Sequence, residues 1–257
     1  MIRLDDISLF YPGHPVKILD SISWRIGRGE KWVLFGPNGS GKTKLLEIIA
    51  GYIYPSAGEV TRFGMRQGES DIRDLRLRIG YVSTPMRERF PAGETVTDVI
   101  LSGPRASVGL YDEPSPDEVA RAGRLLESAG LADKGPRRFG TLSDGERQKI
   151  LMLRAIMPEP DLLLLDEPAM GLDLPAREGL LSTLASLCEG KSTSVVYVTH
   201  YTDEITPLFE KIFMIQRGRA FYSGSMADGL TGGNLSGIFG TPVAVIRRNG
   251  RYFTAPV

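Results

Sequence analysis

The stretch GPNGSGKT at residues 36–43 contains the side chains of this chain best suited to hold a phosphate chain. It fits the pattern G-x-x-x-x-G-K-[ST] between an apolar run, KWVLF, and a helix-like run, KLLEIIAG. Its glycines let successive main-chain N–H groups turn inward onto phosphate oxygens, and the following helix adds the positive end of its dipole. A glycine-rich helix start alone would not explain the lysine and the threonine. The predicted nucleotide-binding residues are Gly36, Pro37, Asn38, Gly39, Ser40, Gly41, Lys42 and Thr43.

Two of these side chains and one acidic pair could carry the chemistry of phosphate release. Lys42 is expected to reach the β- and γ-phosphates, and the Thr43 hydroxyl is expected to ligate Mg²⁺. Asp166 and Glu167 close the apolar run LLLL, at the end of a strand where parallel α/β sheets present ligand sites. Asp166 could hold Mg²⁺ and Glu167 could act as general base for the attacking water. Taken alone, the pair is equally compatible with a solvated acidic turn.

The stretch LSDGE has a structural and a functional interpretation. Ser143-x-x-Glu146 is a capping box that predicts the start of an apolar helix. The same helix start, with a serine and Gly145, could bind an anion. His200 at the end of SVVYVTH and Tyr11 after an N-terminal strand would each be ordinary residues by themselves.

Buried strands and connecting helices must position these groups. Alternation at Ile22, Trp24 and Ile26 predicts a half-buried strand among short strands over residues 2–35. Apolar runs predict strands at residues 31–35, 59–63, 79–83, 161–168 and 194–200. Arg217-Gly218 and Asn249-Gly250 predict hairpin turns near the C-terminus.

Residues 84–160 differ from the rest of the chain, because their pattern is helical and their loops are rich in Pro, Gly and Arg. Ser115-x-x-Glu118 predicts a capping box, with Pro116 at the first helical position and Gly130 as the stop. A further helix is predicted from about Pro175, capped by Asp173. The chain is therefore expected to be α/β with a helical insertion.

Composition excludes several classes of protein. The chain has 257 residues, which suits one large domain or a core with an inserted subdomain. Its 31 basic and 31 acidic residues cancel, so no bulk charge attracts nucleic acid. The single cysteine, Cys188, excludes an internal disulfide framework and suits a reducing cytosol. No apolar run approaches the ~18 residues of a membrane span. A soluble, cytoplasmic protein without direct membrane insertion is expected.

The motifs, taken in order, resemble the ATP-binding subunits of ATP-binding cassette (ABC) transporters. That order is Tyr11, GPNGSGKT, LSDGE, LLLLDEP, the segment of residues 171–173 (GLD) and His200, and it covers the chain through at least Gly224. LSDGE about fifteen residues before LLLLDEP separates this family from kinases and GTPases. The resemblance implies a P-loop NTPase (RecA-like) α/β core with an antiparallel β subdomain and an inserted helical subdomain. It implies ATP and Mg²⁺ as ligands and an ATPase activity.

The resemblance also implies a role for each motif residue. Tyr11 would stack on adenine, a contact worth ~1–3 kcal/mol at other stacking sites. Ser143 and Gly145 would bind the γ-phosphate of ATP held by a second copy, because family members dimerise head to tail with two ATP molecules at the interface. Asp173 would lie at that interface. His200 would contact the γ-phosphate and align the water with Glu167.

Two positions depart from the family pattern. Thr84 occupies the place of a glutamine that usually follows the strand at residues 79–83, which puts a direct contact with Mg²⁺ and water in doubt. Asp144 and Glu146 stand in a signature that usually reads LSGGQ, which places carboxylates near a phosphate-facing helix start. Neither departure removes the lysine, the Mg²⁺ carboxylate or the general base.

The expected organisation is a single ABC ATPase domain. Residues 1–83 and 161–224 would form the α/β core with the β subdomain, residues 84–160 the helical subdomain and residues 225–257 a C-terminal extension with a hairpin. The expected function is ATP hydrolysis that drives a separate membrane permease, with the subunit peripheral on the inner face of the membrane. VTDVILSG and FGTPVAVIRRNGRYF look most like members tied to metal-chelate or molybdate uptake. The alternatives are a soluble ABC ATPase without a permease, in a regulatory or mechanical role, and a small-molecule P-loop kinase, which LSDGE disfavours.

Overall fold

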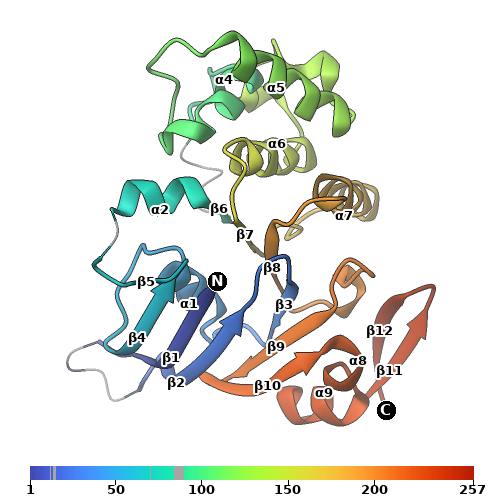
Figure 1. Cartoon of the computed structure of the whole chain (residues 1–257). Coiled ribbons are helices and arrows are strands. Elements are labelled where there is room, and N and C mark those ends of the chain that lie inside the picture. Colours follow the sequence, from blue (N-terminus) through green and yellow to red (C-terminus); the bar gives the residue numbers. More distant parts are fainter. Residues whose placement is uncertain (12, 14–15, 70, 84–89) are drawn as a thin grey trace. The chain divides into compact units, whose positions relative to one another are not determined.

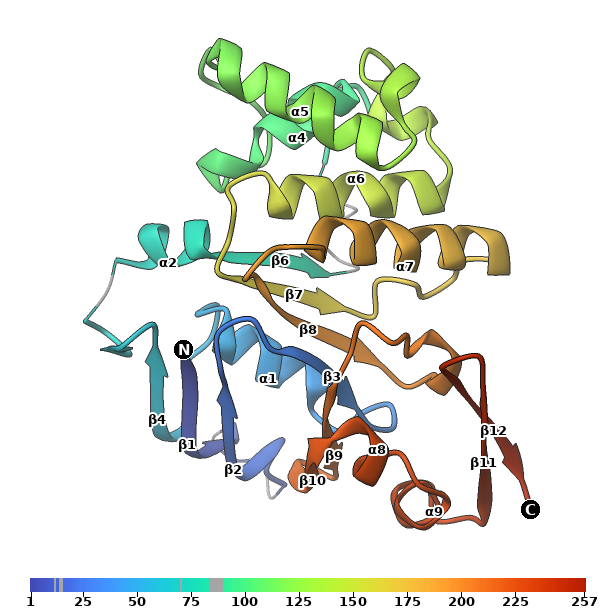
Figure 2. The ribbon, with the colours of Figure 1, turned by 45° about the vertical axis from the view of Figure 1, so that its right-hand side comes forward.

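The computed structural model describes residues 1–11, 13, 16–69, 71–83 and 90–257. These residues form two compact units, Met1–Ile72 with Ser194–Val257, and Arg73–Thr193. Figures 1 and 2 show the elements of both units, coloured along the chain. No helix within the described residues is both long enough and apolar enough to span a bilayer.

The first unit contains a four-stranded antiparallel sheet in the order β2-β1-β4-β5 (Figure 1). Ile22, Trp24 and Ile26 are buried on β2, as their alternation predicts, because every second side chain of a strand points to the same face. The register pairs Leu4 with Trp24 on one side of β1 and with Val60 on the other. The strands are β1 (Ile2–Leu9), β2 (Leu19–Ile26), β4 (Ala57–Arg62) and β5 (Met65–Arg66).

A second set of strands in this unit carries the α/β core. β3 (Lys31–Phe35) pairs in parallel with β8 (Ser194–Thr199) and β9 (Lys211–Gln216), and β9 pairs antiparallel with β10 (Arg219–Ser225). β8 is buried at all six positions, which is why it reads as a continuous apolar run. Trp24 stacks on Phe213 at a centroid distance of 4.5 Å and meets Trp32 edge-on, so aromatic packing joins the two sheets.

The first unit is completed by α1 (Lys42–Ile49), the 3₁₀ turn η4 (Thr202–Glu204), α8 (Met226–Gly229), α9 (Gly232–Phe239) and the hairpin of β11 (Val243–Arg248) and β12 (Arg251–Pro256). Arg217-Gly218 and Asn249-Gly250 both have positive φ angles and join β9 to β10 and β11 to β12. Both predicted hairpin turns are therefore confirmed. The sequence did not predict α8 or α9.

The second unit contains the parallel pair β6 (Ile79–Ser83) and β7 (Leu162–Asp166) and most of the helices. Helices α4, α5 and α6 pack on one another, and α6 packs on α7 (Figure 2). The helices are α2 (Ile72–Arg78), which begins at the boundary of the units, α4 (Val96–Leu101), α5 (Pro116–Ser128), α6 (Asp144–Ile156) and α7 (Leu174–Cys188). Three 3₁₀ turns connect them, η1 (Gly103–Arg105), η2 (Ala132–Lys134) and η3 (Phe139–Thr141).

Helix starts in this unit follow the predicted caps. Ser115 and Ser143 each form a complete capping box, with Glu118 and Glu146 respectively. The Asp173 side chain caps α7 as predicted, and the helix begins at Leu174, one residue before the predicted start. Cys188 is buried at the end of α7, as expected for a small apolar residue. The mixed α/β class with a parallel sheet and a helical region is confirmed, and the predicted helical segment, residues 84–160, lies inside the second unit.

Candidate functional site

The loop at residues 36–43 is shaped by glycines that have no room, or no favourable backbone angle, for a side chain. A Cβ on Gly36 would lie 2.2 Å from the main-chain oxygen of Ile215 on β9. Gly39 and Gly41 have φ angles of 75° and 104°, which only glycine adopts readily. The chain therefore leaves β3 and enters α1 at Lys42 along a backbone path that can turn N–H groups inward onto an anion.

The polar side chains of this loop suit phosphate oxygens. Lys42 is 5% exposed, and its Nζ donates to the carbonyl oxygens of Gly36 at 2.9 Å and Pro37 at 3.1 Å. Its ammonium group therefore lies within the turn. The Ser40 hydroxyl is buried and has no hydrogen-bond partner among the described residues. Thr43, in the first turn of α1, is exposed. A buried ammonium and a buried unsatisfied hydroxyl beside main-chain N–H groups fit a bound phosphate.

His200 and Tyr11 belong to the same unit as this loop. The register of β3 and β8 pairs Phe35 with Thr199, so Gly36 and His200 follow paired residues at the carboxyl ends of neighbouring parallel strands. The His200 ring packs against Tyr201 at a centroid distance of 4.1 Å. Tyr11 is 49% exposed.

The acidic pair lies in the second unit, at the carboxyl end of β7. Asp166 is 6% exposed, and Glu167 has a φ angle of 47°, which is uncommon for a residue with a side chain. Strain of this kind persists where surrounding structure fixes a side chain for function. The register of β6 and β7 pairs Ser83 with Asp166. Thr84, which follows Ser83, lies outside the described residues.

The LSDGE stretch forms the first turn of α6. Ser143 Oγ accepts from the Glu146 main-chain N–H at 3.3 Å, and Glu146 Oε2 accepts from the Ser143 N–H at 2.9 Å. The Ser143 hydroxyl also lies 3.0 Å from Glu146 Oε2. These contacts hold Glu146 as a carboxylate, because the hydrogen bond from the Ser143 main chain lowers its pKa.

The start of α6 lies against the start of α7. A Cβ on Gly145 would lie 2.8 Å from the Cβ of Ala176, so only glycine allows this approach. Asp173 Oδ1 accepts from the Ala176 N–H at 2.9 Å. Ser143, Gly145 and Asp173 are therefore brought together by the packing of two helix N-termini within one unit.

Each unit thus assembles half of the predicted site. The first contains the loop at residues 36–43, Tyr11 and His200, and the second contains Asp166, Glu167, Ser143, Gly145 and Asp173. Sequence reasoning missed the cations that face the two acidic residues of LSDGE. Asp144 pairs with Arg147 at 2.5 Å, and Glu146 pairs with Lys134 at 3.3 Å. The spacing i, i+3 on a helix could have revealed Arg147, whereas no local signal points to Lys134.

The residues predicted for Mg²⁺ suit that ion chemically. No cluster of three or more His, Cys, Asp or Glu side chains within the described residues could hold a metal by itself. Mg²⁺ usually takes only one or two protein oxygens and completes its shell with phosphate oxygens and water. Thr43 in the first unit offers one exposed hydroxyl, and Asp166 in the second unit offers one nearly buried carboxylate, both oxygen donors of the kind that Mg²⁺ prefers.

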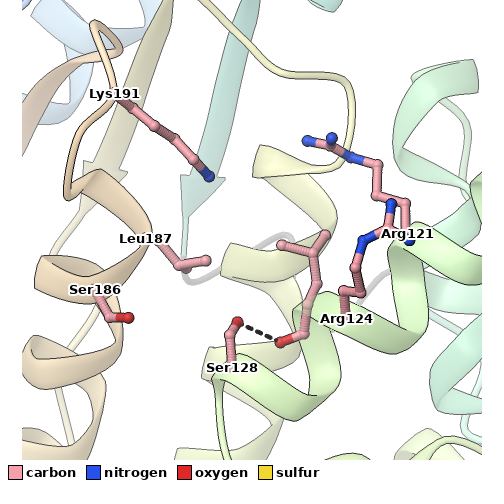
Figure 3. Close-up of a pocket in the computed structure, with 7 residues that line it drawn as sticks. Arg121, Arg124, Ser128, Ser186, Leu187 and Lys191 are labelled. Atoms are coloured by element: carbon pink, nitrogen blue, oxygen red, sulfur yellow. Dashed lines mark hydrogen bonds between the residues drawn. The ribbon is translucent and has the colours of Figure 1, made fainter.

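A separate surface cavity of about 230 Å³ lies between α5 and α7 (Figure 3). Figure 3 shows the side chains of Lys191 and Leu187 on one side of it and those of Arg121 and Arg124 on the other. Arg121 is paired with Glu159. The lining also includes Ser128 from the last turn of α5 and Ser186 from the last turn of α7.

Comparison with known proteins gives close relatives over nearly the whole chain. A model of the ABC transporter family matches residues 19–170. The uncharacterized ABC transporter ATP-binding protein YlmA of Bacillus subtilis (strain 168) is 39% identical over 255 residues, which cover 98% of this chain and 96% of the relative. The high-affinity zinc uptake system ATP-binding protein ZnuC of the same organism is 32% identical over 220 residues, 85% of this chain and 92% of the relative.

Solved structures agree with these matches. An inward-facing ABC transporter described as of metal-chelate type superposes with a TM-score of 0.79 and 25% identity, covering 100% of this chain and 97% of the other. A dimeric ATP-binding cassette in a post-hydrolysis state, bound to ADP and Pi, gives a TM-score of 0.74 and 26% identity, covering 88% of this chain and 99% of the other.

Proposed function

This chain belongs to the ABC transporter family, and from that membership we propose that it powers a separate membrane permease. It is an ABC ATPase cassette that binds and hydrolyses ATP. The observation that carries the proposal is the structural similarity to a chain of an inward-facing ABC transporter, which covers 100% of this chain. The similarity therefore includes residues 225–257, which lie beyond the residues 19–170 matched by the family model.

ATP is held between two copies of the chain arranged head to tail. The triphosphate lies in the loop at residues 36–43 of one copy, where Lys42 balances its β- and γ-phosphate charge. Tyr11 stacks on the adenine. Ser143 and Gly145 of the second copy meet the γ-phosphate, with Asp173 at the interface. The start of α6 supports this assignment, because Asp144 and Gly145 are its first two residues and their main-chain N–H groups have no preceding turn of the helix to donate to.

Hydrolysis uses groups at the ends of β7 and β8. Glu167 accepts a proton from the attacking water, and His200 holds that water and the γ-phosphate in line. Thr43 and Asp166 would hold Mg²⁺, and the bound ion would supply positive charge to the phosphate oxygens. Loss of the γ-phosphate removes the link between the two copies, so the dimer opens. This cycle of closing and opening supplies the motion passed to the permease.

The remaining parts of the chain are assigned to docking and support. Residues 84–160, of which the structure describes 90–160, form the helical subdomain that meets the permease. Residues 1–83 and 161–224 form the core with the β subdomain, and residues 225–257 form the extension that ends in the β11–β12 hairpin. Docking of this kind places the subunit on the cytoplasmic face of a membrane. Relatives named for zinc and metal-chelate transport favour uptake of a metal complex.

Copurification tests the coupling to a permease. A tagged copy is expressed from its own chromosomal locus, membranes are dissolved in a mild detergent and the complex is captured in the presence of ATP. The expected product contains a multi-span membrane protein at a one-to-one ratio with this chain. Purified chain and membrane protein, mixed in vesicles, should then show ATPase activity that rises when a metal complex is supplied.

Recovery of the chain alone, with full ATPase activity in the soluble fraction, would favour the alternative of an ABC ATPase without a permease. Thr84 in place of a glutamine is the sequence feature on which that alternative rests.

A further inference from the structure

The first turn of α6 carries two carboxylates at the place where a phosphate is expected to bind. Each carboxylate has a cation beside it. Asp144 pairs with Arg147, which lies one turn further along the same helix. Glu146 pairs with Lys134, which comes from η2, ten residues before the helix begins. The two pairs leave the helix start without net charge.

Of the two carboxylates, Glu146 has the stronger effect on the expected phosphate site, because it contacts Ser143 directly. Its Oε2 faces the Ser143 N–H and hydroxyl, at 2.9 and 3.0 Å, and its Oε1 lies 3.3 Å from Lys134 Nζ. The carboxylate is thus held between the serine and the lysine. The side chains of Lys134 and Glu146 are 20% and 28% exposed, so water screens this pair less than it screens a fully exposed one.

A charge at this position acts directly on an incoming phosphate. Ser143 must donate its hydroxyl proton to the γ-phosphate, although Glu146 Oε2 lies within hydrogen-bond distance of the same hydroxyl. A carboxylate next to the phosphate also repels it, and repulsion between like charges across an interface is costly. Lys134 opposes both effects, because it attracts the carboxylate on the oxygen away from the serine and its ammonium charge offsets the charge of that carboxylate.

We propose that Lys134 is a positioning residue for the shared ATP site, acting as the counter-charge that lets a signature containing Glu146 close onto the γ-phosphate of a second copy. The proposal rests on the head-to-tail dimer of the proposed function. Lys134 does not touch ATP in this account. Its effect passes entirely through Glu146, so it should vanish when Glu146 loses its charge.

A purely structural role for Lys134 makes a different prediction. Lys134 ends η2 and also lies 3.6 Å from Asp133, so it could simply fix this turn beneath α6. In that case, its loss would impair the protein whatever the residue at position 146. A double-mutant cycle between the two positions distinguishes the roles.

The experiment uses the full chain carrying Glu167→Gln, which should retain ATP in the closed dimer. Sedimentation velocity with saturating ATP and Mg²⁺ gives the dimer dissociation constant. Lys134→Met should raise this constant by about tenfold, whereas Lys134→Arg should keep it within about twofold of the parent. Lys191→Met is the matched control, because it removes an exposed lysine of the same unit that has no ion pair among the described residues. ATP affinity of the monomer, measured at low protein concentration, should not change in Lys134→Met.

The decisive variant is Glu146→Gln combined with Lys134→Met. On the Glu146→Gln background, Lys134→Met should change the dissociation constant by less than about twofold. Lys134→Met could instead raise the dissociation constant as much on the Glu146→Gln background as it does in the parent with Glu146. That result would overturn the proposal and show that Lys134 acts by fixing the turn at η2. Unchanged dimerisation of the single Lys134→Met variant would also overturn it, while leaving the head-to-tail dimer standing. A Glu167→Gln parent that stays monomeric would contradict the dimer itself, and this inference with it.

Discussion

Arg62 at the end of β4 donates from its Nε to the main-chain oxygen of Ile49, at the last residue of α1, over 2.7 Å. A second nitrogen of the same guanidinium donates to the oxygen of Ile48. Arg62 is 4% exposed, and burial lowers its pKa to about 10, which still leaves it charged at neutral pH. The antiparallel sheet thus supplies the cation that satisfies the carboxyl end of the phosphate-binding helix.

Loss of this cap should destabilise the first unit. Arg62→Met keeps the length and much of the apolar stem but leaves two carbonyl oxygens of α1 without their donor. The free energy of unfolding should fall by about 2 kcal/mol, as measured by urea denaturation. Arg66→Met is the control, because Arg66 is exposed on β5 and its guanidinium pairs with Glu59 at the surface. Equal stability of the two variants would show that the Arg62 contact contributes nothing.

Gly36 should tolerate no side chain. The Cβ of Gly36→Ala would lie 2.2 Å from the main-chain oxygen of Ile215, so β9 or the loop must move. We expect a loss of about 2–4 kcal/mol in stability and at least a tenfold weaker ATP affinity, measured by denaturation and by equilibrium binding. Gly123→Ala on the open face of α5 should instead stabilise the chain by about 0.5–1 kcal/mol. Normal ATP affinity in Gly36→Ala would contradict the geometry of this turn.

The capping box of α6 should make stability depend on pH. Hydrogen bonds from Ser143, and then from Lys134, lower the pKa of Glu146 in the folded chain below its usual 4.5. A carboxyl group with a lowered folded pKa stabilises the fold above its unfolded pKa and loses that contribution as pH falls through the folded pKa. Wild type should therefore be more stable than Glu146→Gln by about 1 kcal/mol at pH 6, and the difference should disappear toward pH 3. A difference that stays constant with pH would mean that the charge of Glu146 is not involved.

Glu167→Gln should separate ATP binding from hydrolysis. The substitution removes the general base but leaves the phosphate contacts, so ATP should bind and hold two copies together. Light scattering should report a dimer with ATP and Mg²⁺ and a monomer with ADP, while the turnover rate falls by about 10²-fold or more. Lys42→Ala in the same background should bind no ATP and form no dimer. A Glu167→Gln variant with undiminished turnover would remove Glu167 from the chemistry.

The local parts of the fold and site could be predicted from sequence. Capping boxes at Ser115 and Ser143 and the turn at Asn249-Gly250 depend on residues within a few positions of one another, and all three were confirmed. The run LLLLD became β7 because a strand buried on both faces needs apolar residues throughout.

Elements and contacts that depend on distant partners could not be predicted. α9 has the sequence GGNLSGIF, whose glycines disfavour a helix, and it forms because Leu235 and Ile238 are buried and Thr231 caps its start. Arg62 reaches α1 across thirteen residues, and Lys134 reaches Glu146 across a turn. These pairs exist only once the chain has folded, since no periodic pattern connects their positions.

The most direct test is a crystal structure of the chain with Mg²⁺ and a non-hydrolysable ATP analogue. The account predicts two copies related head to tail, with the γ-phosphate of each analogue in contact with Lys42 of one copy and Ser143 of the other. An analogue bound away from Lys42, or one enclosed by a single copy with Ser143 facing solvent, would contradict it.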